Sequence, residues 1–303
     1  MMIKVKNLSK SYEEVEALKN ISFDVKSKEI FGLIGPDGAG KTTLMRILTS
    51  LLLFDDGEVE VMGKSPIKDY QFIRNNIGYM PGKFSLYEDL TVEENLSFFA
   101  NIFGTTIEKS YNLIKDIYQQ IEPFKNRKAG ALSGGMKQKL ALCAALIHYP
   151  KILFLDEPTT GVDPVSRKEF WHIIKKLHEH DITIFVSTPY MDEANLCDRI
   201  ALIDKGEILN IDQPQNISKV FDKHLYGIQC REGNYQLMKH LRAYEHFDSV
   251  FPFGEQVHYT DQRNEDITEG IYQFLESKGL SDIKLEKIES TIEDVFIRLM
   301  TKN

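Results

Sequence analysis

The 303-residue sequence has few of the features that mark secreted, zinc-binding or membrane-spanning proteins. Its three cysteines, Cys143, Cys197 and Cys230, are far apart and include no C-x-x-C pair, so we expect reduced thiols, not disulfides or a zinc site. The N-terminus, MMIKVKNLSK, lacks the apolar core of a signal peptide. The longest apolar stretches, residues 48–54 and 140–147, are far shorter than the roughly 20 residues that span a bilayer. These absences predict a cytoplasmic protein that serves a membrane, if at all, from outside the lipid.

The sequence also lacks a long basic run and a sustained heptad repeat. A formal net charge of −8 argues against a nucleic-acid partner, because phosphate binding relies on clustered Lys and Arg. Hydrophobic content of 42% and charged content of 27% are ordinary for a globular protein. The length allows a full α/β core with a second small domain, and we expect no nucleic acid among its partners.

The stretch from Gly35 to Thr43, GPDGAGKTT, fits the P-loop pattern and lies between an apolar run, residues 30–34, and a helical pattern, residues 43–52. Its glycines let backbone N–H groups turn toward one point, and the following helix aims its positive end there. Lys41 is expected to reach the β- and γ-phosphates of ATP, and the Thr42 hydroxyl to hold Mg²⁺. The predicted ATP-binding residues of this loop are Gly35, Pro36, Asp37, Gly38, Ala39, Gly40, Lys41, Thr42 and Thr43.

The elements around the loop follow from hydrophobic periodicity. Residues 2–8 and 21–25 alternate apolar and polar side chains, which is typical of antiparallel strands with one wet face. Tyr12 lies between them, and we expect its ring either to stack on adenine or to pack within the domain. A capping box at residues 91–94 predicts a helix start, and a helical pattern continues over residues 105–129.

A second group of motifs follows in the middle of the chain. The segment LSGGMKQ, residues 132–138, precedes a helix and by itself is only an N-cap signal. After that helix, the apolar run at residues 152–155 is typical of a parallel strand buried on both faces, and it ends in Asp156 and Glu157. Ligands of doubly wound sheets bind at the carboxyl ends of such strands, where the P-loop also lies. The two carboxylates are therefore predicted to lie near the nucleotide, with capping of the next segment as their alternative role.

In order and spacing, GPDGAGKTT, LSGGMKQ, ILFLDEP and the following TGVDP resemble the ATP-binding subunits of ABC transporters. The resemblance covers about residues 1–215, and LSGGMKQ so close before ILFLDEP is its most specific part. It implies an α/β P-loop ATPase domain of the ABC type, with a mixed sheet and a helical subdomain. It also implies ATP and Mg²⁺ as cofactors, and a peripheral place on the cytoplasmic face of the cell membrane beside separate permease subunits.

The resemblance further implies a site shared by two ATP-binding domains that pair head to tail, as a homodimer or with a related ATPase. Each ATP would contact the P-loop of one domain and the signature of the other. The signature residues here are Ser133, Gly134, Gly135 and Gln138. Asp156 and Thr42 would hold Mg²⁺, while Glu157 would act as general base on the attacking water. Asp163 would lie on the turn that meets the partner domain, or else serve that turn locally.

Two positions depart from the family pattern. After the strand at residues 77–80 the family usually has glutamine, whereas Gly82 here offers no side chain to Mg²⁺ or to the attacking water. After residues 186–188 the family usually has histidine, whereas Pro189 can neither contact a γ-phosphate nor donate a proton. We expect intact ATP binding and slowed but present hydrolysis, because the metal ligands and Glu157 remain.

The motifs stop before the C-terminal part, for which we expect a linker at residues 216–223 and an accessory domain at residues 224–303. Its pattern predicts strands over residues 225–230, 250–253, 256–259 and 283–288, and helices over residues 235–244, 267–277 and 292–300. This order predicts a small ferredoxin-like α+β domain with a final helix. His240, His246 and His258 are not at ligand spacing, so we expect ordinary surface or core histidines. The ending STIEDVFIRLM resembles the tails of exporter-type ATP-binding subunits.

Three functions fit these observations. The leading hypothesis is a subunit that uses ATP to energise a membrane permease for export, with the permease contact at residues 83–90, where plain packing is the alternative. A second is a regulatory partner that binds ATP without useful turnover, which Gly82 and Pro189 favour. A third is a soluble ABC ATPase acting on DNA or the ribosome, although such proteins usually carry two copies of the domain or a long coiled coil.

Overall fold

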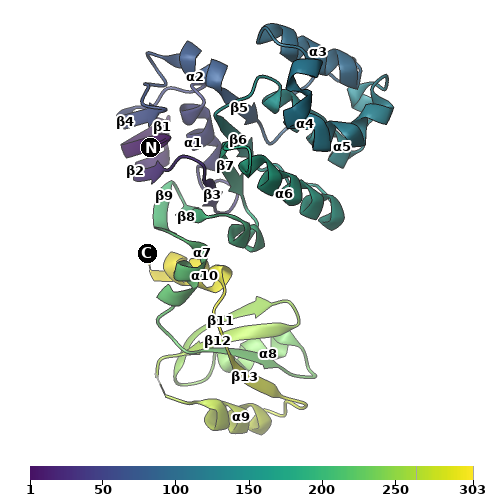
Figure 1. The fold of residues 1–303 in the computed structure, drawn as a ribbon. Coiled ribbons are helices and arrows are strands. Elements are labelled where there is room, and N and C mark those ends of the chain that lie inside the picture. The colour runs from purple at the N-terminus through teal and green to yellow at the C-terminus, as the bar shows by residue number, and fades with distance from the viewer. Residues whose placement is uncertain (264, 303) are drawn as a thin grey trace. The chain divides into compact units, whose positions relative to one another are not determined.

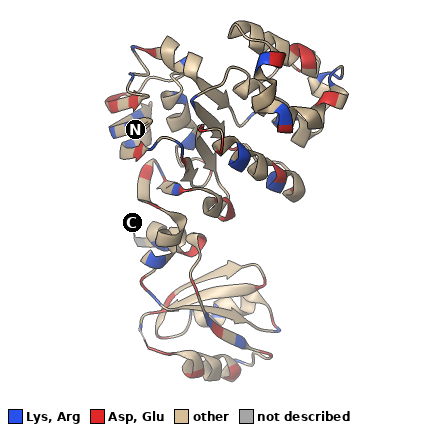
Figure 2. Cartoon of the chain, viewed as in Figure 1, with Lys and Arg blue, Asp and Glu red and all other residues tan. Residues whose placement is uncertain are grey.

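The computed structural model describes residues 1–263 and 265–302. The chain divides into two compact units, Met1–Gln215 and Asn216–Asn303, whose ribbons run from purple to green and from green to yellow in Figure 1. No helix within the described residues is both long enough and apolar enough to cross a membrane. Figure 2 shows Lys and Arg interspersed with Asp and Glu over the ribbon of the N-terminal unit, with no long stretch of one sign.

The N-terminal unit is built on two sheets, one antiparallel with strand order β2-β1-β4 and one with order β5-β6-β7-β3-β8-β9. Neighbouring strands of the larger sheet run parallel, except for the antiparallel pair β8 and β9. The predicted mixed sheet is therefore confirmed. The strands are β1 Ile3–Tyr12, β2 Val15–Val25, β3 Ile30–Ile34, β4 Asp56–Val61, β5 Ile77–Met80, β6 Ile152–Asp156, β7 Thr183–Thr188, β8 Arg199–Asp204 and β9 Glu207–Asp212.

Helices α3, α4 and α5 gather beside the larger sheet as the expected helical subdomain (Figure 1). The α-helices of the first 217 residues are α1 Lys41–Leu48, α2 Tyr70–Asn76, α3 Val92–Ile102, α4 Ile107–Ile121, α5 Gly134–Leu146, α6 Pro164–His178 and α7 Pro214–Ile217. Short 3-10 segments lie at Glu122–Phe124, Ala129–Ala131, Met191–Leu196 and Ser218–Val220. The capping box predicted at the start of α3 is present, since Thr91 and Glu94 bond to each other's backbone N–H groups.

The core of this unit explains why its central strands read as continuous apolar runs. Every residue of β3, β6 and β7 is buried, as expected for parallel strands covered on both faces. The rings of Phe31 and Phe185 stack with centroids 5.5 Å apart, and Phe154 packs against Phe185 at 5.7 Å. These rings belong to one buried cluster that also includes side chains of β1, β2 and α1. The core thus fixes the carboxyl ends of β3, β6 and β7, where the predicted site residues lie.

Two expected boundaries in this unit are wrong. The first strands are longer than residues 2–8 and 21–25 and meet in a tight hairpin, so Tyr12 ends β1 opposite Val15. Backbone pairing between the two strands also includes residues that do not follow the alternation of apolar and polar side chains, so the alternation alone predicted strands that were too short. The helix expected over residues 105–129 ends at Ile121, where a 3-10 turn containing Pro123 follows, because proline cannot continue the α-helical hydrogen bonding.

The C-terminal unit contains one antiparallel sheet with strand order β11-β12-β10-β13. Its elements are β10 Leu225–Gln229, α8 Asn234–Leu241, β11 Phe247–Phe253, β12 Gln256–Asp261, α9 Thr268–Ser277, β13 Lys284–Ile288 and α10 Ile292–Lys302. This is the predicted order of strands and helices, although β11 begins three residues before the expected strand at residues 250–253. Apolar residues from one face of the sheet and from α8 and α9 form its core.

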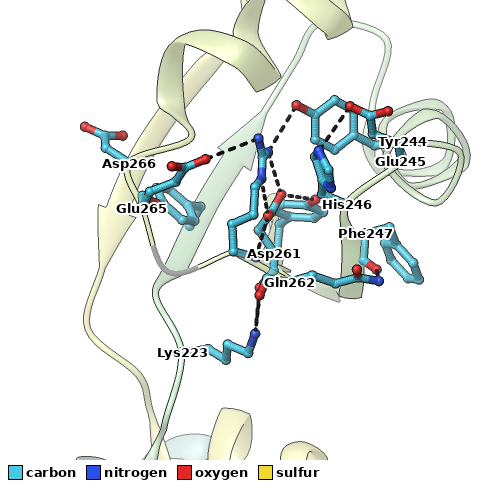
Figure 3. Close-up of polar contacts among 12 residues, drawn as sticks. Lys223, Tyr244, Glu245, His246, Phe247, Asp261, Gln262, Glu265 and Asp266 are labelled. Atoms are coloured by element: carbon cyan, nitrogen blue, oxygen red, sulfur yellow. Dashed lines mark hydrogen bonds and ion pairs between the residues drawn. The ribbon is translucent and has the colours of Figure 1, made fainter.

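A polar network closes the loop that follows β12 (Figure 3). The side chain of Asp261 is buried and accepts hydrogen bonds from Tyr259 Oη at 3.0 Å and from Arg263 Nε at 2.9 Å. Arg263 also donates to Tyr244 Oη at 3.2 Å, and Lys223 Nζ donates to the backbone oxygen of Asp261 at 3.1 Å. One buried carboxylate therefore links β12, the following loop and the end of α8.

His258 is a core histidine, one of the two kinds that its spacing predicted, and it is paired with a carboxylate. Its ring is buried on β12, where its Nδ1 lies 2.6 Å from Asp294 of α10 and its face stacks on Phe253 at 4.1 Å. Asp294 also accepts from the backbone N–H and the hydroxyl of Thr291, and so caps the start of α10. The sequence did not indicate this pair because its members lie 36 residues apart.

Candidate functional site

The P-loop connects β3 to α1, and its glycines are needed for backbone geometry. Gly40 has a φ of 103° and precedes the first turn of α1. A Cβ at this position would lie 2.5 Å from the backbone oxygen of Ala17, so no other residue fits without movement. Gly38 has a φ of 80°, which also favours glycine. These two turns bend the chain over the helix N-terminus, a geometry that suits the expected phosphate cradle.

Lys41 is the central cation of the site. Its side chain is only 3% exposed, and its Nζ donates to the backbone oxygens of Gly35 and Pro36, each at 2.8 Å. The same amine lies 3.1 Å from Glu157 Oε1. Three acceptors of the chain itself therefore hold the positive charge at the centre of the loop.

Asp156 ends β6, and the hydroxyl of Thr42 is near its carboxyl group. Ser187 of the neighbouring strand faces Asp156 in register and donates to Asp156 Oδ1 at 2.7 Å. Burial raises the pKa of Asp156, while the hydroxyls of Ser187 and Thr42 act in the opposite direction. A hydroxyl and a carboxylate are the hard oxygen ligands that Mg²⁺ prefers. No group of three or more His, Cys, Asp or Glu among the described residues could itself hold a metal, so phosphate and water would complete this site.

Glu157 follows Asp156 in a turn with a positive φ of 50°. Its backbone N–H bonds to the backbone oxygen of Ser187 at 3.0 Å, and the hydroxyl of Thr160 lies 3.4 Å from its Oε2. The side chain is 22% exposed and faces the cavity above the P-loop. A carboxylate in this position can receive a proton from a water molecule beside a bound γ-phosphate.

The P-loop opens onto a cavity of about 830 Å³. Tyr12 lines it and is 42% exposed, and Lys10 Nζ lies 5.7 Å from its ring centroid. An aromatic ring in this position can stack on a base. Of the nine predicted loop residues, those that line the cavity are Asp37, Gly38, Gly40, Lys41, Thr42 and Thr43. Gly35, Pro36 and Ala39 do not line it; the first two hold Lys41, and Ala39 is buried.

Four further residues with charged side chains line this cavity without having been predicted from the sequence. They are Glu14, Glu16, Lys19 and Lys205. Two hairpins bring them there: β1 and β2 carry the first three, and the turn between β8 and β9 carries Lys205. That turn is joined to the P-loop, since the N–H of Gly206 donates to the oxygen of Ala39 at 3.1 Å. Only long-range strand pairing places these residues, and no local pattern marks them.

The signature lies elsewhere in the unit. Ser133 caps α5 by accepting from the N–H of Met136 at 3.4 Å, and a Cβ on Gly135 would lie 3.2 Å from Ser166 Oγ of α6. The signature residues Ser133, Gly134, Gly135 and Gln138 are absent from the residues that line the P-loop cavity. Within one chain, the signature and the P-loop are therefore not brought together around one nucleotide.

The remaining predicted residues lie around the two carboxylates or on the following turn. Asp163 caps α6, accepting from the N–H groups of Val165 and Ser166 at 3.1 and 3.0 Å, which is its expected local role. A Cβ on Gly82 would lie 3.0 Å from the backbone oxygen of Asp156, so this position lies directly against the end of β6. Pro189 follows β7 and is half-buried.

Comparison with known proteins agrees with this geometry. Residues 18–160 match the family model described as ABC transporter. The chain is 33% identical over 304 residues to the Nod factor export ATP-binding protein I of Rhizobium sp. (strain N33), covering 98% of this chain and 96% of that protein. This chain belongs to the family of ATP-binding subunits of ABC transporters. Members of this family are ATPases, and the chain carries their P-loop, signature and paired carboxylates in one fold.

Other relatives and solved structures agree. The probable multidrug ABC transporter ATP-binding protein YbhF of Escherichia coli (strain K12) is 38% identical over 274 residues, which are 89% of this chain. The matched part covers 47% of the length of that relative, so this chain spans about half of it. The dimeric post-hydrolysis structure of the ATP-binding cassette MJ0796 with ADP and Pi has a TM-score of 0.64 at 29% identity, covering 70% of this chain and 98% of that one. An ATP-binding subunit of an ABC transporter gives a TM-score of 0.67 at 25% identity, with 73% and 93% covered.

Proposed function

We propose that this chain binds ATP with Mg²⁺ in the P-loop cavity and hydrolyses it with Glu157 as general base. The observation that carries this proposal is that Lys41, Thr42 and Glu157 line one cavity, with Asp156 directly before Glu157. These residues lie at the carboxyl ends of β3 and β6, two parallel strands of one sheet that are separated by β7. The backbone N–H groups of the loop and the amine of Lys41 would bind the phosphates. Bound Mg²⁺, held by Thr42 and Asp156, would neutralise charge on the phosphates.

The general base has a defined starting position. The amine of Lys41 lies 3.1 Å from Glu157 and has its other hydrogen bonds to its own loop. Phosphate oxygens compete for the same amine, because they carry more negative charge than backbone carbonyls do. Binding of ATP therefore draws Lys41 toward the phosphates and leaves Glu157 free to accept a proton from water.

We further propose that two such domains pair head to tail around two ATP molecules, as a homodimer or with a related ATPase. The signature would then contact the ATP bound by the partner's P-loop. The Ser133 hydroxyl and the N–H groups of Gly134 and Gly135 at the start of α5 would donate hydrogen bonds to its γ-phosphate, and Gln138 lies in the following turn of the helix. The signature residues do not line the P-loop cavity of their own chain, and this favours the head-to-tail arrangement. Asp163, fixed at the N-cap of α6, would hold the turn that meets the partner.

The contact with a membrane permease is proposed at Lys83–Leu90 and the groove beside it. A cavity of about 200 Å³ is lined by Ser85 and Leu86 of this segment, by Phe99 of α3 and Phe103 just after it, and by apolar residues of α5. It lies where β5 enters the helical subdomain and continues to Pro81, next to Gly82. A partner helix in this groove would touch the segment that lies against the metal-binding strand end.

The names of the relatives favour export. The relatives named above are called multidrug transporter and Nod factor export proteins. On this basis we propose a peripheral position on the cytoplasmic face of the cell membrane, beside separate permease subunits and without a nucleic-acid partner. We also propose that residues 224–303, after a linker at residues 216–223, form a ferredoxin-like accessory domain, which the strand order β11-β12-β10-β13 supports.

Steady-state ATPase assays on the purified full-length chain test the hydrolytic function. Wild type should hydrolyse ATP in the presence of Mg²⁺, and Glu157→Gln should lower kcat by about 10²- to 10⁴-fold, because the amide cannot accept the proton. ATP binding by the variant, measured with a fluorescent analogue, should persist. Equal hydrolysis rates for wild type and Glu157→Gln would refute the proposal.

One observation favours a second candidate, a regulatory subunit that binds ATP with little turnover. Because a Cβ on Gly82 would already lie 3.0 Å from the backbone of Asp156, the strand end leaves little room for a side chain beside the metal position. Together with Pro189, this removes two groups that usually contact the γ-phosphate and the water. The same assay distinguishes the candidates, since a regulatory subunit would bind the analogue tightly without exceeding the Glu157→Gln rate.

A further inference from the structure

One nearly fully buried carboxylate lies outside the nucleotide cavity. The side chain of Glu193 is 1% exposed and belongs to the 3-10 segment Met191–Leu196, which begins two residues after Pro189. We propose that Glu193 positions the turn from Glu157 to Asp163 and thereby sets the rate of hydrolysis. This inference rests on the proposed function, in which the two ends of that turn are the general base and the residue that meets the partner.

The first contact of Glu193 is with the turn itself. Thr159, which is also buried, donates from Oγ1 to Glu193 Oε1 at 2.8 Å. Thr159 lies two residues after Glu157, and its backbone oxygen accepts from the N–H of Val162 at 3.3 Å. A single side-chain hydrogen bond from the 3-10 segment therefore holds the middle of the turn.

The second contact reaches α6. Arg167 Nε lies 3.6 Å from Glu193 Oε1, and the same guanidinium pairs with Asp192 and lies over the ring of Tyr190 at 4.8 Å. The backbone N–H of Arg167 bonds to the oxygen of Asp163 at 2.9 Å, in the first turn of the helix. The carboxylate of Glu193 is thus connected to both sides of the turn.

The chemistry of this carboxylate argues against a role in stability alone. Its Oε2 is buried and has no hydrogen-bond partner among the described residues. An ion pair removed from water is often no more stabilising than apolar residues of the same size, because the charges lose their hydration. What a charged pair adds is a specified arrangement of the groups around it. Here those groups are the turn, the start of α6 and the segment after β7.

The turn needs such an outside anchor. Its own hydrogen bonds lie at or beyond the long end of the usual range: the Thr160 nitrogen is 3.2 Å from the Glu157 oxygen, the Val162 nitrogen is 3.3 Å from the Thr159 oxygen, and Thr160 Oγ1 is 3.4 Å from Glu157 Oε2. Gly161 has a φ of 73° and open space around its Cβ position, so nothing packs against the tip. Pro189 has no hydrogen-bond donor to offer a γ-phosphate, and the contact of Glu193 with Thr159 connects the segment after β7 to the turn that begins at Glu157.

Two variants of Thr159 separate positioning from folding. Thr159→Val keeps the shape of the side chain but removes the donor to Glu193, whereas Thr159→Ser retains the hydroxyl. We expect Thr159→Val to lower kcat about 10- to 100-fold, as misplacement of a catalytic group by about 1 Å does, with KM for ATP within about twofold of wild type. Thr159→Ser should retain most of the wild-type kcat. Glu193→Gln, which loses the pairing with Arg167, should resemble Thr159→Val.

A second measurement does not depend on turnover. Hydrogen exchange of the backbone amides at residues 160–163 should be faster in Thr159→Val than in wild type and close to wild type in Thr159→Ser. The inference is wrong if Thr159→Val has the amide exchange rates and the kcat of wild type. It is also wrong if Thr159→Val and Thr159→Ser both have a lower kcat together with a changed KM for ATP. Should wild type hydrolyse ATP no faster than Glu157→Gln, the proposed function fails, and the exchange rates alone then decide whether Glu193 fixes the turn.

Discussion

At the scale of single residues, the candidate nucleotide site combines side chains typical of a P-loop ATPase with two missing ones. Lys41 lies 3.1 Å from Glu157, and Thr42 lies near Asp156. In the proposed function these four residues bind and hydrolyse ATP. Gly82 lies against the same strand end without a side chain. In the proposed function, the groups that bind phosphate are therefore all present, while the activation of water would depend on Glu157.

Replacement of Pro189 tests how much the missing imidazole limits the rate. The residue follows β7, and the turn is already fixed by the N–H of Tyr190, which bonds to Thr188 Oγ1 at 3.1 Å. Pro189→His should therefore place an imidazole near the γ-phosphate and raise kcat by about tenfold or more, since general acid–base or polar assistance typically contributes at least that much. Steady-state ATPase assays measure the change.

The matched control for this variant is Pro189→Ala. It restores the backbone N–H and the flexibility of a normal residue but adds no imidazole. An increase in kcat for both variants would show that the backbone, and not the missing imidazole, limits hydrolysis. No increase for either would place the limiting step elsewhere.

Which residues of the site could be predicted depends on whether their signal is local. Thr42 and Asp156 belong to short motifs whose neighbouring strand and helix fix their place, and the structure brings them into contact. Lys205 and Glu193 reach their positions only through a hairpin and a buried contact 34 residues away along the chain. No spacing within a motif encodes such contacts, so the sequence did not indicate these residues.

At the scale of elements, the network after β12 offers a test of what holds the C-terminal unit together. Burial alone would raise the pKa of Asp261, but hydrogen bonds from Arg263 and Tyr259 outweigh it and leave the pKa below its usual value. Because the pKa is lowered on folding, the carboxylate stabilises the fold above its unfolded pKa, and this contribution is lost as the pH falls through the folded pKa. Asp261→Asn should therefore lower the free energy of unfolding by about 1–3 kcal/mol at pH 7 and by less in acid.

Urea unfolding at several pH values measures this effect. The single tryptophan, Trp171, lies in the N-terminal unit, so its fluorescence reports that unit, while far-ultraviolet circular dichroism follows both. Glu265→Gln is the control, because Glu265 is an exposed partner of Arg263 at 3.5 Å and its loss should change the free energy by less than about 1 kcal/mol. Equal destabilisation by the two variants, or one that is independent of pH, would contradict the assigned role of Asp261.

The elements themselves were more predictable than their ends. The order of strands and helices in the C-terminal unit follows from periodicity, because the strands and the helices α8 and α9 each direct apolar side chains toward the core cluster. The ends depend on partners: β1 extends to Tyr12 because β2 pairs with it across the hairpin, and α4 stops before Pro123. His258 and Asp294 meet because β12 packs under α10, which a pattern within either element does not show.

At the scale of the whole molecule, the decisive question is what covers the apolar groove beside Lys83–Leu90. The groove lies at the junction of β5 with the helical subdomain, and residues of both line it. In the proposed function its occupant is a permease, and the adjoining Gly82 and Asp156 would sense that contact through the backbone. The signature helix is linked to the same segment, since Lys137 Nζ lies 3.0 Å from Glu88 Oε1.

Co-purification from gently solubilised membranes tests this occupant. A tagged wild-type chain should bring down a membrane protein with several spanning helices, and Leu86→Glu should lower its recovery at least about tenfold, because a charge buried in an apolar contact loses its hydration. The control Val220→Glu changes an exposed apolar residue that does not line this groove, and it should leave recovery unchanged. Recovery of a ribosome or of nucleic acid in place of a membrane protein would contradict the proposed transport function. If both variants recover the membrane protein equally, the transport function still holds, but the permease contact does not lie at Lys83–Leu90. The groove would then bind another partner.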